Sequence, residues 1–326
     1  MSDFVQQQNS ICDFNSSDSW VILSPIEQSI KRKIEAVGTP LKDWDIQINY
    51  GIKTGFNDAF IISTEKRNEI LANCQTEDER QRTAELIRPI LRGRDIKRYG
   101  YDWANLYLIA TFPACHYDIE NYPAVKNYLL SFEEENLRDS GYDWVADNYL
   151  ADFCKQKLAQ TGKFIEIAGK RITIGNTPEK ARKRTSNKWF ETQDSISYWE
   201  DFGKQQIIWI ELSDEPKFAL AENIFSMNTV FFMTGEHILH LLGLLNSQLI
   251  KWYFKHCIGT TSGVGTNRWL KYTIEKIPMV SISHKLEELS LSISKNFSPN
   301  TDLEIDLLVC HLYNLNDEEI NYIVSH

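Results

Sequence analysis

The sequence lacks the features of an exported, membrane-spanning or zinc-binding protein. Its six cysteines form no Cys-x-x-Cys pair, and no histidine follows them at zinc-finger spacing. Scattered thiols of this kind are typical of a reducing compartment. The N-terminus has no basic segment followed by an apolar run, and the longest apolar stretch, residues 238–245, is too short to span a bilayer. We therefore expect a cytoplasmic protein with no membrane partner.

The motifs of common catalytic sites are missing as well. There is no Gly-x-Ser-x-Gly elbow, no phosphate-binding loop and no His-Glu-x-x-His pair. His237 and His240 are the only close pair of histidines, and no further ligand lies near them in the sequence, so a surface or packing role is favoured. None of the nine prolines neighbours another, which excludes the Asn/Asp-Pro-Pro-aromatic tetrapeptide of amino-methyltransferases. We predict no catalytic residue, no metal site and no cofactor in this chain.

Two alternatives of a different class stay open. Asp214, Glu215 and Lys217 contain an acidic-x-Lys triplet, and Asp95-Ile96-Lys97 is another. A metal-dependent nuclease needs clustered carboxylates and a lysine, so a self-contained DNA endonuclease is one alternative. The acidic tail makes a protein-interaction scaffold the other. Loss of metal-dependent cleavage in a Glu215→Ala variant would favour the nuclease.

Charge is distributed unevenly along the chain. The formal net charge is -10, which argues against nucleic acid as a partner. However, residues 151–210 carry 11 Lys/Arg against 7 Asp/Glu, whereas residues 281–326 carry 2 against 8. The acidity therefore comes partly from the tail, and the middle of the chain is basic.

Hydrophobic periodicity and turn residues predict an α/β (mixed α+β) fold with short strands and a helical C-terminal segment. Ser24-Pro25 opens the first helix and residues 38–40 end it. Helices are predicted over residues 25–37, 64–73, 77–88, 122–137, 147–158, 236–257, 283–295, 302–313 and 317–323. Strands are predicted at residues 46–50, 59–62, 106–111, 163–174, 206–212, 218–220 and 228–233.

Several stretches resemble the TaqI-like C-terminal specificity domain of type II adenine-specific DNA methyltransferases, especially the fused type IIG restriction–modification enzymes. The first is Asn49-Tyr50-Gly51-Ile52-Lys53-Thr54-Gly55-Phe56-Asn57-Asp58-Ala59-Phe60-Ile61-Ile62, and about 40 residues later comes Ile90-Leu91-Arg92-Gly93-Arg94-Asp95-Ile96-Lys97-Arg98-Tyr99. Further matches are at residues 122–126, 184–191, 244–249, 277–278, 304–309 and 312–320. Their order makes the resemblance cover roughly residues 20–326.

The resemblance implies a sequence-specific DNA-binding module. It implies an N-terminal linker and helix over residues 1–45, a target-recognition domain over 46–280 and a helical tail over 281–326. The catalytic domain, which would bind S-adenosylmethionine and flip an adenine, is expected outside this chain. The partners are then double-stranded DNA and a methyltransferase catalytic domain or subunit.

Polar and basic side chains in four stretches are the candidate DNA contacts. They are Lys53, Thr54 and Asn57 on the glycine turn; Arg92, Arg94, Lys97 and Arg98; Lys180, Arg182, Lys183, Arg184, Thr185, Ser186, Asn187 and Lys188; and Arg268 beside the glycine-rich residues 259–265. Each stretch also has an interpretation without DNA contact: a structural turn, an ion-pair network that includes Asp95, or a solvated loop.

Overall fold

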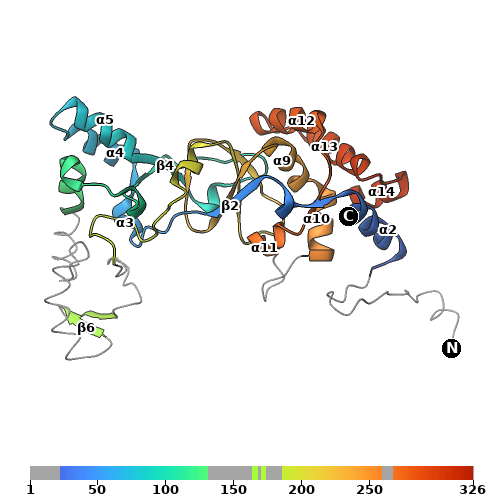
Figure 1. Ribbon diagram of the computed structural model, residues 1–326, viewed down its shortest axis with the longest axis horizontal. Coiled ribbons are helices and arrows are strands. Elements are labelled where there is room, and N and C mark those ends of the chain that lie inside the picture. The colour runs from blue at the N-terminus through green and yellow to red at the C-terminus, as the bar shows by residue number, and fades with distance from the viewer. Residues whose placement is uncertain (1–22, 131–163, 168–169, 174–185, 259–266, 326) are drawn as a thin grey trace.

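The computed structural model of the protein describes residues 23–130, 164–167, 170–173, 186–258 and 267–325. The molecule is elongated, with α4 and α5 at one end and α2 and α14 at the other (Figure 1). It is a mixed α/β fold with several small sheets and a helical C-terminal segment, as predicted. No helix in the described ranges has the length and apolarity to cross a membrane.

The first helix, α2 (Pro25–Val37), begins and ends where the sequence predicts. The Ser24 hydroxyl accepts a hydrogen bond from the Glu27 amide, and the Ser24 amide donates to the Glu27 carboxylate at 2.7 Å. This reciprocal capping box satisfies two of the amide groups that a helix start leaves unpaired. Ile30 and Ile34 lie on the buried face.

A four-stranded antiparallel sheet lies at the centre of the molecule. Its order is β2 (Ile46–Tyr50), β11 (Val230–Gly235), β8 (Gln206–Ile210) and β9 (Ala219–Ala221). Side chains alternate between its faces: the paired Phe232 and Ile208 enter one hydrophobic core, and the paired Phe231 and Trp209 enter the other. The sheet therefore separates two cores, and its inner strands β8 and β11 are largely buried on both sides.

The first core contains a second sheet of order β10 (Phe225–Ser226), β4 (Ile87–Leu91), β5 (Leu106–Ile109) and β3 (Ile61–Ser63). Helices α3 (Asn57–Phe60), α4 (Thr64–Ala72) and α5 (Glu77–Leu86) accompany it, and residues 123–130 are helical.

Two sequence predictions in this region are wrong in detail. Residues 59–60 belong to α3, so the predicted strand starts only at Ile61. The helix predicted to Arg88 ends at Leu86, and Pro89 lies inside β4. Because β4 pairs with β5 through Pro89 and with β10 from Ile90 on, the proline stands where the pairing partner changes.

The second core joins α2 to the C-terminal helices. These are α9 (Ile238–Asn246), α10 (Gln248–Tyr253), a π-helical turn (Phe254–Ile258), α11 (Lys271–Ile274), α12 (His284–Lys295), α13 (Pro299–Leu312) and α14 (Asp317–Ser325). The three helices of the predicted tail are confirmed. The single helix predicted over residues 236–257 is wrong, because Ser247 is extended and its hydroxyl caps α10.

Smaller elements complete the chain. β1 (Thr39–Pro40) pairs with β12 (Pro278–Met279). Instead of the one strand predicted over residues 163–174, the structure has two antiparallel strands, β6 (Phe164–Ile167) and β7 (Lys170–Thr173). Short 3₁₀ helices occur at Leu41–Asp43, Gly93–Asp95, Pro113–Cys115, Ile119–Asn121 and Trp199–Gly203. The helix predicted over residues 147–158 lies outside the described residues, as does the end of the one predicted over 122–137.

Candidate nucleic-acid interface

The two stretches that carry the resemblance meet at one turn, Met227–Thr229, which connects β10 to β11 and is called the β10–β11 turn below. From the first stretch, the Ile52 amide donates to the Ser226 carbonyl at 2.7 Å, and the Asn228 amide donates to the Ile52 carbonyl at 3.0 Å. From the second, the Leu91 carbonyl accepts from the Met227 amide at 2.9 Å. Residues far apart in the sequence are thus joined by backbone hydrogen bonds.

Glycines make this close approach possible. A Cβ on Gly51 would lie 2.0 Å from the Met227 carbonyl oxygen. A Cβ on Gly93 would lie 3.0 Å from both the Thr229 hydroxyl oxygen and a methyl of Ile210. Gly55 has a φ of 81°, a conformation that side chains disfavour. Gly51 and Gly93 therefore have a packing role at the β10–β11 turn, whereas Gly55 serves the backbone conformation of its own turn.

The predicted contacts on the glycine turn differ in their access to solvent. Lys53 and Asn57 are exposed, whereas Thr54 is only 1% exposed. The Thr54 hydroxyl donates to the Asn57 side-chain oxygen at 2.7 Å and accepts from the Phe56 amide at 3.1 Å. Thr54 therefore holds the turn before α3 and has no surface to offer a duplex.

The arginines of the second stretch divide into bonded and exposed groups. The Arg92 guanidinium forks onto Asp95, with an Nη2–Oδ1 distance of 2.7 Å and an Nε–Oδ2 distance of 3.0 Å. Asp95 is buried; desolvation opposes its ionisation, but the hydrogen bonds from Arg92 outweigh it and lower the pKa of that carboxyl. Arg94 is exposed, and no hydrogen bond or ion pair of its side chain occurs within the described part of the chain.

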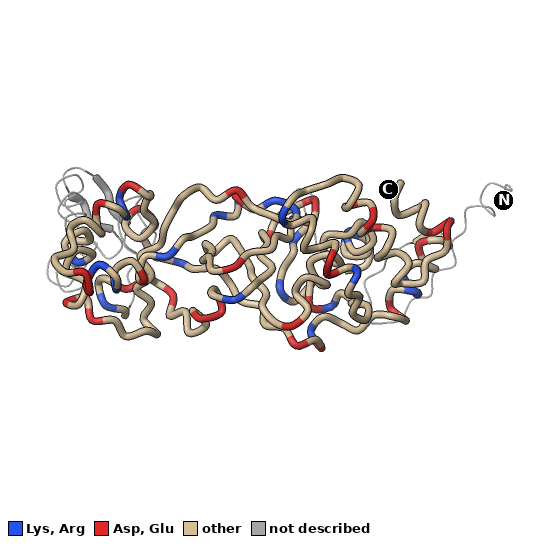
Figure 2. Tube along the Cα trace, turned by 90° about the horizontal axis from the view of Figure 1, so that it is seen from above, with Lys and Arg blue, Asp and Glu red and all other residues tan. Residues whose placement is uncertain are grey.

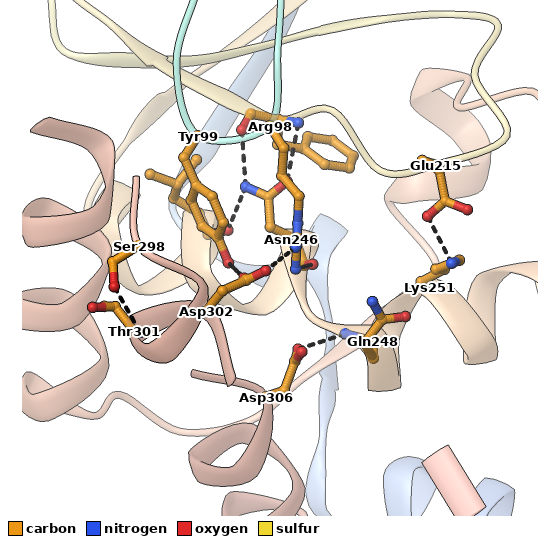
Figure 3. A network of polar contacts seen from close by, with 12 residues as sticks. Arg98, Tyr99, Glu215, Asn246, Gln248, Lys251, Ser298, Thr301, Asp302 and Asp306 are labelled. Carbon is orange, nitrogen blue, oxygen red and sulfur yellow. Dashed lines mark hydrogen bonds and ion pairs between the residues drawn. The ribbon is translucent and has the colours of Figure 1, made fainter. Parts of the chain in front are cut away.

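Arg98 and Tyr99 tie this stretch to α13 (Figure 3). The Arg98 guanidinium pairs with the Asp302 carboxylate and donates to the Asn246 carbonyl at 2.6 Å. The buried Tyr99 hydroxyl donates to the other Asp302 oxygen at 3.0 Å. Arg98 therefore ties the second stretch to α9 and α13, which is the ion-pair alternative weighed from the sequence.

Asn246, which lies in the matching stretch 244–249, has a structural role. Its side chain is fully buried; it accepts from the Phe218 amide at 3.2 Å and donates to the Phe218 carbonyl at 2.8 Å. The Phe218 carbonyl also accepts from the Tyr99 amide at 2.8 Å, so the Asn246 side chain and Tyr99 together satisfy the backbone groups of Phe218.

Lys97 pairs with Asp102 at the surface, where both side chains are more than half exposed. Such a pair is weak and can exchange for a phosphate. Figure 2 shows Lys and Arg along the whole length of the molecule with Asp and Glu between them. The charge pattern alone therefore does not locate the interface.

The described end of the basic loop packs beside the glycine turn. The Asn187 side chain donates to the Thr192 and Gln193 carbonyls at 2.8 and 2.9 Å, and the Gln193 amide donates to the Thr54 carbonyl. Ser186 and Lys188 are exposed. The remaining predicted contacts of this loop, Lys180, Arg182, Lys183, Arg184 and Thr185, lie outside the described residues.

Arg268 is half-exposed and pairs with Glu211 across the bridge between Leu212 and Arg268. The hydrogen bonds to Glu211 raise the pKa of the Arg268 guanidinium, which is charged at any physiological pH. The glycine-rich residues before it, 259–265, lie outside the described residues.

Two carboxylates of the alternative nuclease motifs, Glu215 and Asp95, are engaged in ion pairs with basic side chains. Glu215 pairs with Lys251 at 2.6 Å (Figure 3), and Asp95 is bonded to Arg92.

His240, one of the close pair of histidines, is engaged in packing contacts. Its ring forms a hydrogen bond with the Val280 carbonyl and accepts one from the Ser283 amide, and burial lowers the pKa of the ring. Across the described ranges, no three His, Cys, Asp or Glu side chains are grouped to hold a metal ion.

Asp306 gives the network of Figure 3 a pH dependence. Desolvation raises the pKa of this buried carboxyl to about 6, and the negative charge of Asp302 acts in the same direction. The hydrogen bond from the Gln248 amide to the carboxylate, at 2.8 Å, and the positive charges of Arg98 and Lys251 lower the pKa but do not outweigh the desolvation. Because the folded pKa exceeds the unfolded one, the folded state holds the proton more tightly. Stability contributed by this proton is present below about pH 4 and is lost as the pH rises through about 6.

We therefore expect Asp306→Asn to stabilise the protein by about 1–3 kcal/mol at pH 7 and to have little effect at pH 4. Asparagine keeps an oxygen for the Gln248 amide but carries no charge to desolvate. Urea unfolding of both proteins at pH 4, 5, 6 and 7 measures the difference. A difference that does not change with pH would contradict this role of Asp306.

Asn228 and Thr229 are polar residues that the sequence reasoning assigned to a strand. The structure places both in the β10–β11 turn, exposed to solvent, and β11 begins only at Val230. The signal was available: Asn-Thr between Phe225-Ser226-Met227 and Val230-Phe231-Phe232 interrupts an apolar run with residues that favour turns.

Comparisons with known proteins agree with the resemblance. The family of the TaqI-like C-terminal specificity domain matches residues 88–279. The type IIG restriction endonuclease BpuSI is 11% identical with a TM-score of 0.51, covering 90% of this chain and 32% of its own. The type IIL restriction-modification enzyme MmeI, solved in complex with DNA, is 13% identical with a TM-score of 0.48, covering 88% and 37%. This chain thus spans about a third of either enzyme. No curated protein matches.

Proposed function

The chain belongs to the family of TaqI-like C-terminal specificity domains, and from that premise we propose that it recognises a DNA target sequence for a restriction–modification enzyme. The observation that carries the proposal is the convergence of both characteristic stretches on the β10–β11 turn. Lys53 and Arg94 are exposed beside that turn, one from each stretch. Cations held at a rigid junction can neutralise phosphates without rearrangement.

The proposal assigns catalysis to residues outside the 326 of this chain. The sequence contains no adjacent prolines, so it has no Asn/Asp-Pro-Pro-aromatic tetrapeptide. We propose that a methyltransferase catalytic domain or subunit supplies the S-adenosylmethionine site and that the modified base is an adenine. In the type IIG restriction endonuclease BpuSI, the part of similar fold is only 32% of the enzyme, which is consistent with a catalytic part elsewhere in such an enzyme.

Duplex binding should weaken steeply with salt. If about four phosphates are neutralised, log K falls with log salt at a slope near -3.6. We expect about a hundredfold weaker binding at 200 mM than at 50 mM salt. Gel-shift titration of a mixed-sequence duplex with the full chain measures this slope. The chain carries a net charge of -10. If acidic side chains dominated its whole surface, it would bind no duplex at either salt concentration.

Two results of this titration would contradict the proposed function. No binding of any duplex at 50 mM salt, by the chain alone or with a catalytic partner, would exclude DNA recognition. Binding that does not change with salt would exclude the phosphate contacts.

A further inference from the structure

The β10–β11 turn presents two polar side chains that have no internal partner in the described part of the chain. Asn228 and Thr229 are exposed, and neither the Asn228 amide group nor the Thr229 hydroxyl makes a side-chain hydrogen bond there. The backbone around them is satisfied: the Asn228 amide donates to Ile52, and the Val230 amide donates to the Met227 carbonyl at 2.9 Å. Their donors and acceptors are therefore available to a ligand at no cost in internal bonds.

The turn is held rigidly from both sides. Gly51 brings one backbone so close that no Cβ fits beneath the Met227 carbonyl. On the other side, Gly93 packs against the Thr229 side chain. A polar group on a fixed backbone loses little conformational freedom on binding, which favours selective recognition.

Each side of the turn also carries a cation. Lys53 follows Ile52, which pairs with Met227, and Arg94 follows Gly93, which contacts Thr229. Both cations are exposed. On the Lys53 side, the Asp194 carboxylate accepts a hydrogen bond from the Lys53 backbone amide at 3.3 Å, and no ion pair of the Lys53 ammonium occurs within the described residues. The Lys53 ammonium is left for solvent or for a phosphate.

We propose that the β10–β11 turn reads base edges in a DNA groove, with Asn228 as the specificity-determining residue and Lys53 and Arg94 on the flanking phosphates. The inference rests on the proposed function and deepens it. The Asn228 amide offers the donor–acceptor pair that matches N7 and N6 of adenine, and Thr229 offers a hydroxyl and a methyl. Arg and Lys beside such a reader fix its position on the backbone.

The test compares base preferences of the full chain and its variants on a randomised duplex library at 50 mM salt. Asn228→Ala should lose the preference for adenine at one position by about 5- to 150-fold, with other positions unchanged. Asn228→Asp, which keeps the size but only accepts hydrogen bonds, should shift that position towards cytosine. Asn321→Ala, an exposed position on α14 at the far end of the molecule, is the matched control.

A second experiment separates the contribution of the two cations from that of Asn228. The double variant Lys53→Gln and Arg94→Gln should bind every duplex more weakly, lower the salt slope by about 2 and keep the same base preference. Lys31→Gln on α2, at the opposite end, should leave the slope unchanged.

The outcomes separate this inference from the proposed function. A wild-type chain that binds no duplex refutes the function itself. A wild-type chain that selects a sequence, together with an Asn228→Ala variant that selects the same sequence with the same stringency, overturns the role of the turn and leaves the function standing. Circular dichroism of each variant establishes that the comparison is made between folded proteins.

Discussion

Replacing Gly51 with alanine is expected to lower the free energy of unfolding by about 3 kcal/mol or more. The new Cβ would lie 2.0 Å from the Met227 carbonyl oxygen and 2.5 Å from its carbonyl carbon. Both are backbone atoms, held by hydrogen bonds to Leu91 and Val230, so no side-chain rotation can relieve the clash. Urea unfolding followed by tryptophan fluorescence measures the change.

Gly100→Ala is the matched control. A Cβ there meets nothing within 4 Å, and Gly100 is not in the left-handed region. We expect its unfolding free energy to stay within about 0.5 kcal/mol of wild type. Equal stability of the two alanine variants would mean that the close approach of Gly51 does not fix the β10–β11 turn. The proposal that Asn228 is presented on a rigid backbone would then be contradicted.

Arg98→Ala should cost about 3 kcal/mol of stability, although Arg98 is a cation in a basic stretch. Its guanidinium bonds both the Asp302 carboxylate and the Asn246 carbonyl, and both partners of the ion pair are less than a quarter exposed. Removing one partner leaves Asp302 poorly compensated near Asp306, and breaking such a pair is costly. Thermal and urea unfolding measure the loss.

Lys97→Ala provides the comparison within the same stretch. Lys97 and Asp102 are 64% and 72% exposed, so their pair should contribute less than about 1 kcal/mol. A double-mutant cycle of Arg98→Ala and Asp302→Ala should give a coupling of more than about 1 kcal/mol. An Arg98→Ala variant with wild-type stability and weaker DNA binding would reverse the assignment of Arg98 as a structural residue.

Local patterns predicted those elements whose sequence signals do not depend on distant partners. Ser24-Pro25 with Glu27 is a complete helix start, and α2 begins there. The three tail helices follow from apolar spacing in the same way. The helix predicted over residues 236–257 failed because Ser247 breaks an apolar run that periodicity alone treats as continuous. Its hydroxyl accepts from the Ile250 amide and starts a second helix.

The role of individual basic residues could not be predicted, because composition does not show which cations already have partners. Arg92 and Arg98 look alike in sequence to Arg94, yet both are bonded to carboxylates and Arg94 is exposed. Asp302 lies about 200 residues from Arg98 in the chain, so only the fold reveals the pair. Asn228 carries no charge, and the sequence does not single it out for the same reason: only the fold shows that both stretches pack against its turn.

The measurement that tests the central claim most directly is sequence selection by the full wild-type chain from a randomised duplex library, read against binding to a scrambled duplex. The account predicts enrichment of one short sequence, bound at least about a thousandfold more tightly than the scrambled duplex at physiological salt. Binding of all duplexes with equal affinity, or of none, would contradict it.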